Sequence, residues 1–169
     1  GTLYRNGVNV TNPEITTLGY GVYNYSAVIT GDANYTGSSE NWTLTVGKQP
    51  TNVDIYINGN LNQNVTITYG VQSNVTAIGY NGTVTLYRDG ASVGNPEIAT
   101  LAYGVYNYTA VILDDTNRTG STKTFFLTVG KQPTAVDLFL NGAQNNLTIT
   151  YGTPTNITAI GYNGTLTLY

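Results

Sequence analysis

The chain has 169 residues with a formal net charge of -3, and only 9% of its side chains are charged, against about 25% in an ordinary soluble domain. The absence of Cys and His excludes thiolate and imidazole chemistry, and with it zinc, haem and iron-sulfur centres, so we expect no metal and no cofactor. The six Lys and Arg are scattered rather than arranged in a basic stripe, which argues against a nucleic-acid partner. No apolar run approaches the roughly 18 residues of a membrane span, so none is expected in this segment.

Short runs of alternating apolar and polar residues follow one another along the chain, separated by turn signals such as Asn58-Gly59 and Asp89-Gly90. This pattern is typical of an all-β protein, and no stretch has a helical period. Where the pattern is fullest, it predicts strands near 51–58, 64–69, 73–79, 83–88, 97–102, 104–113 and 122–129.

Successive side chains of a strand point to opposite faces, so alternation also predicts which residues face a core. The predicted core residues are Val53, Ile55, Ile57, Val65, Ile67, Tyr69, Tyr106, Tyr108, Ala110, Ile112, Phe125, Leu127 and Val129. By the same argument Trp42, the single Trp of the chain, should lie inside together with Leu44 and Val46.

The sequence repeats itself with a period of about 83 residues, which is too long for one coil of a solenoid and suits a small β-sandwich. The clearest matches are 12–15 with 95–98, 21–25 with 104–108, and 46–50 with 129–133. After one deletion the offset is shorter by one, and 67–70 and 77–83 match 149–152 and 159–165. The chain is therefore predicted to contain tandem copies of one β-sandwich unit.

Tyr4, Tyr87 and Tyr169 occupy one position in three successive copies, so we expect the chain to start and stop inside a repeat. The predicted division is the C-terminal half of a module over 1–47, a complete module over 48–130, and the N-terminal half of a following module over 131–169. A module this small buries a limited share of its surface and has no disulfide, so contacts with neighbouring modules should add to its stability.

Two stretches, 82–90 (GTVTLYRDG) and 104–111 (GVYNYTAV), resemble the immunoglobulin-like repeat domains of large bacterial and archaeal cell-surface proteins. Residues 31–39 (GDANYTGSS) match those domains most closely, at the loop before their last strand. The resemblance covers the whole chain and implies tandem immunoglobulin-like β-sandwich modules, used as spacers in adhesins, stalks, surface layers and fibres. It implies no catalytic or ligand residue. The second copy departs from the pattern at 114–118, so the two loops need not be used alike.

The one motif with a chemical meaning is Asn-x-Ser/Thr, the acceptor of N-glycosylation. It begins at Asn9, Asn24, Asn34, Asn41, Asn64, Asn74, Asn81, Asn107, Asn117, Asn146, Asn156 and Asn163. The composition alone would give roughly four such triplets, and strand alternation can bring Asn and Thr to this spacing. Asn, however, is disfavoured in strands, so we predict that several of these sites carry glycans.

Other candidates are weaker. The acidic loop containing Asp114, Asp115 and Asn117 has oxygen ligands for Ca²⁺, but two carboxylates are more typical of a solvated turn. Lys48 and Lys131 lie near Asn residues, as in surface domains with isopeptide crosslinks, yet they flank Gly and Pro, which favours a linker. Four carboxylates are expected on polar strand positions, namely Glu14, Asp54, Glu97 and Asp137. Each stands singly, without the second carboxylate that an acid-base pair needs.

The sequence therefore predicts a non-enzymatic structural repeat of an N-glycosylated extracellular filament, stalk or surface layer. Its partners would be covalent N-glycans and neighbouring copies of the same repeat, joined by covalent continuation or by self-association in a filament. The density of acceptors without a single Cys favours an archaeal cell surface. Two alternatives stay open: an adhesin repeat that binds a receptor or carbohydrate through its loops, and separate subunits joined by strand exchange at an exposed edge.

Overall fold

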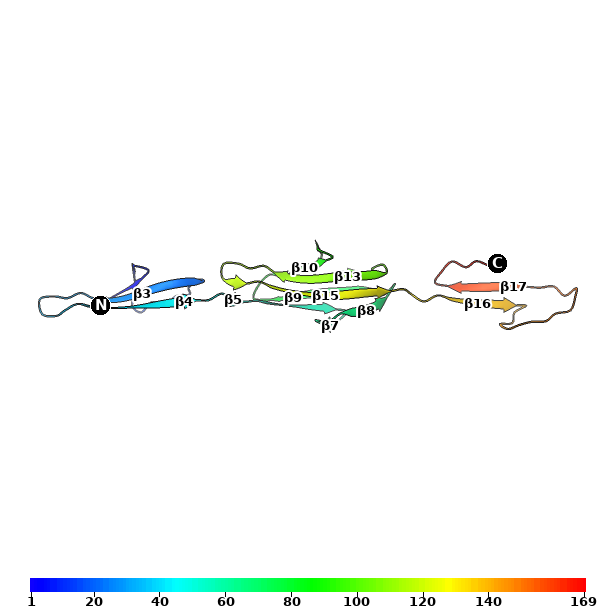
Figure 1. The fold of residues 1–169 in the computed structure, drawn as a ribbon, viewed down its shortest axis with the longest axis horizontal. Coiled ribbons are helices and arrows are strands. Elements are labelled where there is room, and N and C mark those ends of the chain that lie inside the picture. Colours follow the sequence, from blue (N-terminus) through cyan, green and yellow to red (C-terminus); the bar gives the residue numbers. More distant parts are fainter.

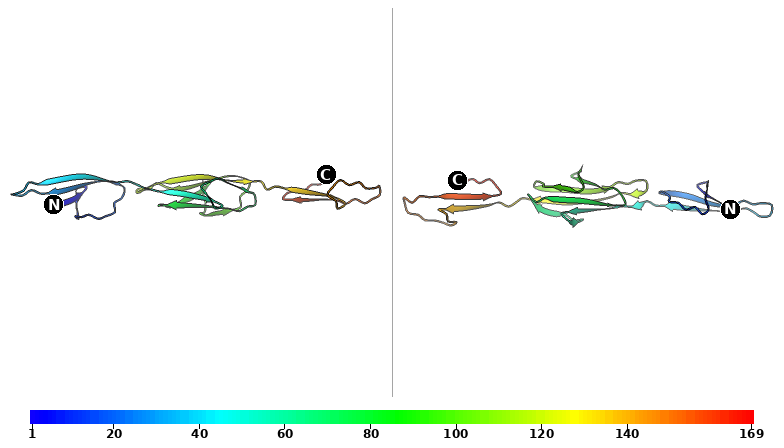
Figure 2. Two further views of the ribbon diagram at one scale, coloured as in Figure 1. Left: turned by 90° about the horizontal axis from the view of Figure 1, so that it is seen from below. Right: turned by 180° about the vertical axis from the view of Figure 1, so that it is seen from behind.

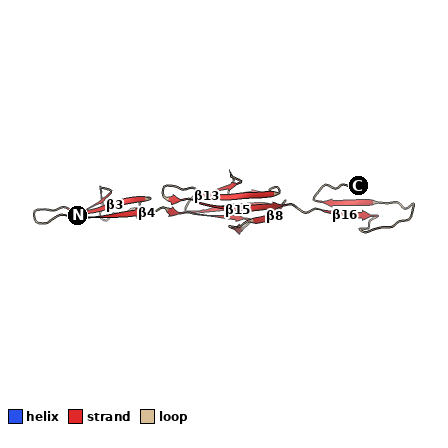
Figure 3. Ribbon diagram, in the orientation of Figure 1, coloured by secondary structure: helices blue, strands red, loops and turns tan.

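The computed structural model describes residues 1–169 as a rod in which three groups of strands follow one another along the long axis (Figure 1). The views from below and from behind show the same linear arrangement (Figure 2). No helix is present (Figure 3), which confirms the all-β prediction. We name the groups by residue range: the leading segment (1–47), the central segment (48–130) and the trailing segment (131–169).

The leading segment forms one antiparallel sheet in the order β2-β1-β3-β4. Its strands are β1 (Thr2–Arg5), β2 (Val8–Val10), β3 (Gly21–Ile29) and β4 (Ser38–Val46). A two-residue turn joins β1 to β2, and Asn6 and Gly7 both have positive φ there, 50° and 79°. Asn-Gly adopts this conformation readily, and its twist matches that of the flanking strands.

The central segment contains two larger sheets. The first has the order β11-β10-β13-β15-β8 and contains β8 (Val65–Thr68), β10 (Thr85–Arg88), β11 (Ala91–Ser92), β13 (Gly104–Ile112) and β15 (Ser121–Gly130). The second has the order β12-β9-β6-β7 and contains β6 (Asn52–Ile57), β7 (Asn60–Leu61), β9 (Ser73–Tyr80) and β12 (Glu97–Ala99). All pairs in these sheets are antiparallel except β8 with β15, which is parallel. A short parallel pair, β5 (Gln49–Pro50) with β14 (Arg118–Thr119), lies at one end.

The two central sheets pack face to face around the only buried cluster of the chain. Its members come from both sheets: Val53, Ile55, Ile57, Val75, Ala77, Leu86, Tyr108, Ala110, Ile112, Leu127 and Val129. Val65, Ile67, Tyr106 and Phe125 pack against this cluster while staying partly exposed. These positions follow the predicted alternation, so the choice of core face was correct for β6, β8, β13 and β15.

The trailing segment is a single antiparallel pair, β16 (Ala135–Leu140) with β17 (Ile157–Tyr162). Residues 147–150 (LTIT), whose counterparts 65–68 form β8 in the central segment, have no strand pairing here. The central β8 is held by β15, and the trailing segment contains no such partner strand.

The two outer segments copy the two central sheets separately. At the repeat offset that relates 12–15 to 95–98, β1, β2, β3 and β4 correspond to β10, β11, β13 and β15, in the same order across the sheet. β16 and β17 correspond to β6 and β9, which are neighbours in the other central sheet. The leading segment is thus a copy of one layer and the trailing segment a copy of part of the opposite layer.

Three of the predicted inward residues are exposed. Trp42 and Leu44 do share a face of β4, but they are 71% and 45% exposed because no second sheet covers that face in the leading segment. Tyr69 is 51% exposed because β8 ends at Thr68, one residue earlier than predicted. The alternation predicted the face correctly in β4, whereas the predicted length of β8 was wrong.

Candidate glycan acceptor surface

The twelve predicted acceptors lie on the outside of the molecule. Eleven of the Asn residues are exposed, and Asn107 is half-buried. They come from all three segments, from strands as well as from the turns and loops between them. Where an acceptor triplet lies in a strand, its middle residue points to the opposite face, as Tyr108 does between Asn107 and Thr109.

The outer face of the leading sheet gathers three acceptors. A row of directly paired residues crosses all four strands, from Asn9 on β2 through Tyr4 and Ser26 to Asn41 on β4. Asn24 lies two residues from Ser26 along β3, and so on the same face. The register of β3 with β4 sets the two triplets antiparallel to each other, and the hydroxyl of Ser26 donates to Oδ1 of Asn41.

The backbone of four acceptors is fixed by the preceding hairpin or loop. The amide N–H of Asn24, Asn74, Asn107 and Asn156 donates to the side-chain oxygen of Asn6, Asn58, Asp89 and Asn141, at 2.8, 2.7, 2.8 and 2.6 Å. Each of these partners has a positive φ, which Asn and Asp tolerate better than other side chains. The recurrence of this contact shows that turn residues help to set the position of each acceptor.

The acceptor side chains differ in how their amide nitrogen is used. Nδ2 of Asn81 and Asn163 donates to the carbonyl oxygen of Pro50 and Pro133, at 3.3 and 3.2 Å. Nδ2 is the atom to which an N-glycan is attached. In the other ten acceptors no hydrogen bond engages it. In Asn74, Asn107 and Asn156, Oδ1 instead accepts from the Thr hydroxyl of the same triplet, at 3.3, 3.0 and 3.1 Å.

Almost every cation of the chain is already paired. Salt bridges join Arg5 with Glu14, Lys48 with Asp114, Arg88 with Glu97, Arg118 with Asp115, and Lys123 with Asp54. The sixth cation, Lys131, lies over the ring of Tyr103, 5.3 Å from its centroid. Since these charges neutralise one another locally, the surface between them consists largely of uncharged Asn, Thr and Tyr.

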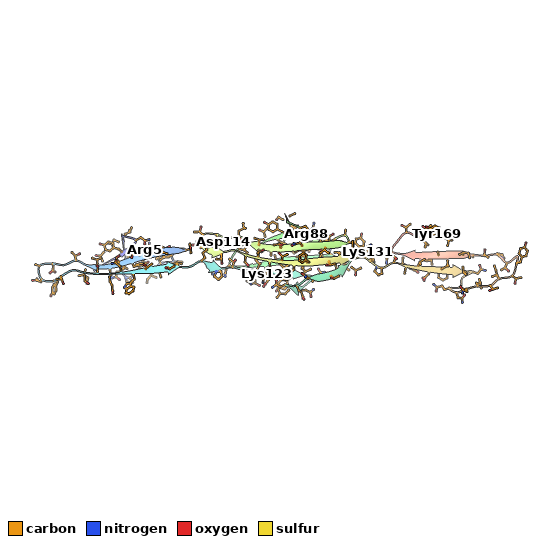
Figure 4. The ribbon with its side chains drawn as sticks, viewed as in Figure 1. Arg5, Arg88, Asp114, Lys123, Lys131 and Tyr169 are labelled. Carbon is orange, nitrogen blue, oxygen red and sulfur yellow. The ribbon has the colours of Figure 1, made fainter.

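Two carboxylates that look isolated in the sequence are parts of a recurring polar group. Glu97 accepts from the guanidinium of Arg88 and, at 2.7 Å, from the hydroxyl of Tyr108. In the leading segment Glu14 holds Arg5 and Tyr25 in the same way, at 2.6 Å each. Figure 4 shows Arg5 and Arg88 in their separate segments. Neither group was predicted from the sequence, and the prediction that Glu14 lies in a strand was wrong, since this residue lies between β2 and β3.

The hydroxyl of Tyr108 is the most deeply placed of these groups. Burial first, and then the hydrogen bond to Glu97, strongly raises the pKa of Tyr108. In the more open leading segment the hydrogen bond to Glu14 is the main reason why the pKa of Tyr25 is raised. Each tyrosine is thus a neutral donor to its carboxylate, and the group ties two strands of one sheet to the stretch that carries the glutamate.

The acidic loop at the junction of the leading and central segments uses its carboxylates internally. Asp114 accepts from Lys48 Nζ at 2.9 Å and from the N–H of Gly120 at 2.5 Å. Asp114 is labelled in Figure 4. Asp115 accepts from the backbone N–H groups of Asn117 and Arg118. These contacts lower the pKa of both carboxyls, chiefly through Lys48 for Asp114 and the N–H of Asn117 for Asp115. Within the chain, no three carboxylates gather where they could hold a metal ion.

Asp54 on β6 is held from two directions. It accepts from Nδ2 of Asn62 at 2.7 Å and, across the two sheets, from Nζ of Lys123 at 2.9 Å. The hydrogen bond from Asn62 and then that from Lys123 lower the pKa of Asp54 from its ordinary value of 3.8. These partners lie 8 and 69 positions away along the chain, so no local pattern around Asp54 could reveal them.

The central segment should lose stability in acid because of these carboxylates. A group whose pKa is lowered in the folded state contributes stability above its unfolded pKa, and that contribution disappears as the pH falls through the folded pKa. We therefore expect the free energy of unfolding to be level down to about pH 5 and to fall below about pH 4. Urea unfolding followed by circular dichroism at pH 7, 5, 4 and 3 measures this. Asp54→Asn should flatten part of the acid decline, and an unchanged profile would contradict the assignment.

No protein-family model, curated protein or solved structure matches the chain. The structure contains no helix that is long and apolar enough to cross a membrane.

Proposed function

We propose that this chain is a structural part of an N-glycosylated extracellular filament, stalk or surface layer, and that it has no enzymatic activity. The observation that carries the proposal is the outward placement of the twelve acceptors, eleven of them exposed, on a surface with few unpaired charges. Its partners are covalent N-glycans and neighbouring copies of the same repeat.

The proposal includes a finer description of the fold. We infer tandem immunoglobulin-like β-sandwich modules of about 83 residues, a length suited to a small sandwich, with 48–130 as one complete module. Support comes from the two packed central sheets and from the parallel pairing of β8 at the edge of an otherwise antiparallel sheet. The return of the same strand order in the leading segment supports a structural period equal to the sequence offset.

Glycans would supply the hydration that charged side chains supply in other proteins. A surface of Asn, Thr and Tyr with 9% charged residues has little electrostatic repulsion to keep neighbouring rods apart. Bulky, strongly hydrated sugars on the outer faces would do so without disturbing the sheets, because the middle residue of a strand triplet stays on the inner face. A rod of strands covered in this way suits a spacer, which must be extended and soluble.

Removal of a single acceptor hydroxyl should remove a single glycan. In a host that glycosylates Asn-x-Ser/Thr, we expect Thr43→Ala to lose the glycan of Asn41, because Thr43 completes that triplet. Thr45→Ala is the matched control, since Thr45 is exposed on the same face of β4 and belongs to no triplet. Intact mass should fall by one glycan and the side-chain difference in the first variant, and by the side-chain difference alone in the second. Equal masses for the two variants would refute the use of Asn41.

A further inference from the structure

The outer face of β15 in the central segment departs from its own pattern at one position. The outward residues of this strand are Thr122, Thr124, Phe126 and Thr128. Threonine suits a solvated strand position, whereas the ring of Phe126 leaves apolar surface in water and is 41% exposed. A single exposed apolar residue is common in proteins, so the meaning of Phe126 depends on its neighbours.

Phe126 lies between two of the predicted acceptors. β13 and β15 run side by side in the middle of the rod (Figure 1), and their register pairs Phe126 directly with Asn107. On the other side, the backbone N–H of Phe126 donates to Oδ1 of Asn64 at 2.9 Å. Directly paired residues of antiparallel strands have Cβ atoms about 4.5–5.5 Å apart on one face of the sheet. Asn107 is therefore the acceptor whose side chain adjoins the ring.

The position of Asn107 is set by its own hydrogen bonds. Its N–H donates to Oδ1 of Asp89 at 2.8 Å, and its carbonyl oxygen accepts from the N–H of Asp89 at 2.8 Å. Its Oδ1 accepts from the hydroxyl of Thr109 at 3.0 Å, and that hydroxyl lies 2.9 Å from the hydroxyl of Thr124. Only Nδ2 is left free, so a group attached there would start from a fixed point beside Phe126.

The leading segment offers a comparison within the same chain. Asn24 is the counterpart of Asn107, and the residue directly paired with it is Thr43. An exposed valine precedes the acceptor by two positions in both segments, namely Val22 and Val105. The aromatic neighbour therefore distinguishes the acceptor of the central segment from its counterpart, and the valine does not.

We propose that Phe126 is the binding platform for the first sugar of a glycan on Asn107. This rests on the proposed function, because it requires that the acceptor carries a glycan. The sugar would be a pyranose with axial C–H bonds on one face, as in the gluco configuration. Such C–H bonds carry a small positive charge and the face of an aromatic ring is negative, so the two attract each other and release water.

The covalent link favours this occupant over a free sugar. A glycan bound to Nδ2 of Asn107 is held next to the ring at a high effective concentration. It would connect β13 to β15, through a covalent bond on one strand and an apolar contact on the other. The unfolded chain lacks this contact, so the glycan should raise the equilibrium constant of folding by about two- to tenfold, the range that aromatic contacts contribute. The glycan of Asn24 has no ring opposite it.

Nuclear magnetic resonance of the full chain tests the contact directly. The chain is made in a host that glycosylates Asn-x-Ser/Thr, and its glycans are trimmed enzymatically to the first N-acetylglucosamine. The sugar protons on Asn107 should be shifted upfield by the ring current and show Overhauser contacts to the ring of Phe126. Phe126→Thr should abolish both effects, and Asn107→Gln assigns the signals. The sugar on Asn24, which faces Thr43, is the internal control and should show neither effect.

Urea unfolding measures the effect on stability. The unsubstituted chain and Phe126→Thr are each prepared from the glycosylating host and from a host without glycosylation. The two bare proteins should both fold, because Phe126 is exposed and the substitution keeps the backbone N–H that Asn64 accepts. Glycosylation should stabilise the unsubstituted chain more than the variant, by the factor given above. All other glycans are common to both proteins and cancel.

The proposal fails if the sugar on Asn107 resembles that on Asn24, or if Phe126→Thr leaves its signals unchanged. It also fails if glycosylation stabilises both proteins equally, or if Asn107 stays bare while other acceptors are occupied. Each of these results would leave the proposed function standing, since that function needs glycans at several acceptors and not at Asn107 in particular. Bare Asn at all twelve acceptors in source cells would remove both.

Discussion

Leu127→Ala should lower the free energy of unfolding of the central segment by about 2–5 kcal/mol, the usual cost of truncating a fully buried leucine. Leu127 is completely buried on β15, among residues of both sheets. The loss has two causes, namely the lost burial of apolar area and the cavity left between two sheets that can close only partly. Urea unfolding followed by circular dichroism, at a concentration where the chain is monomeric, measures it.

Leu44→Ala is the matched control for this prediction. It is the same substitution at the corresponding position of the leading sheet, where the side chain is 45% exposed. In the monomer we expect a change within about 0.5 kcal/mol. Similar losses for the two variants would mean that the leading face is covered in the single chain, contrary to the structure.

Glu97→Ala should destabilise the central segment by about 2–3 kcal/mol, because it leaves a buried hydroxyl without an acceptor and a guanidinium without its carboxylate. Tyr108 is completely buried, and its hydroxyl donates to Glu97 at 2.7 Å. Thermal or urea unfolding of the single variant gives the loss directly.

The double variant Glu97→Ala with Tyr108→Phe separates this cause from a general loss of packing. Removing the hydroxyl removes the unsatisfied donor, so the double variant should be more stable than the sum of the two single changes implies. Additive losses would contradict the role given to the hydrogen bond. Glu14→Ala, in the corresponding group of the leading segment, should leave the unfolding of the central segment unchanged.

Much of the central fold could be predicted from local patterns. The seven predicted strands correspond to observed ones, and the alternation of β6, β13 and β15 identified their buried residues. The short strands β5, β7, β11 and β14 were not predicted. Each has only two residues, too few for an alternating pattern to be recognised.

Burial could not be predicted with the same success as the faces. Trp42 lies on the predicted face of its strand, and yet it is 71% exposed. Alternation is a property of one strand, whereas burial requires a second sheet from another part of the chain. The same limit applies to the groups around Glu14 and Glu97, whose partners are brought together by the register of the sheet. Their recurrence in both copies of the repeat was the signal that could have revealed them.

The positions of the acceptors could largely be predicted from the sequence, because the triplet identifies the residue and alternation identifies its face. The differences among the acceptors could not be predicted from the sequence. Asn81 and Asn163 have their amide nitrogens bound to proline carbonyl oxygens, an arrangement that depends on how distant parts of the chain meet. Each of those two nitrogens donates one of its two hydrogens in this way.

The most direct test of the proposed function is glycopeptide mass spectrometry of peptides that a protease releases from intact source cells. The proposal predicts that peptides of this chain appear before the cells are lysed, and that several acceptors carry glycans, with Asn24 or Asn41 among them. Peptides found only after lysis, with bare Asn at all twelve positions, would contradict it.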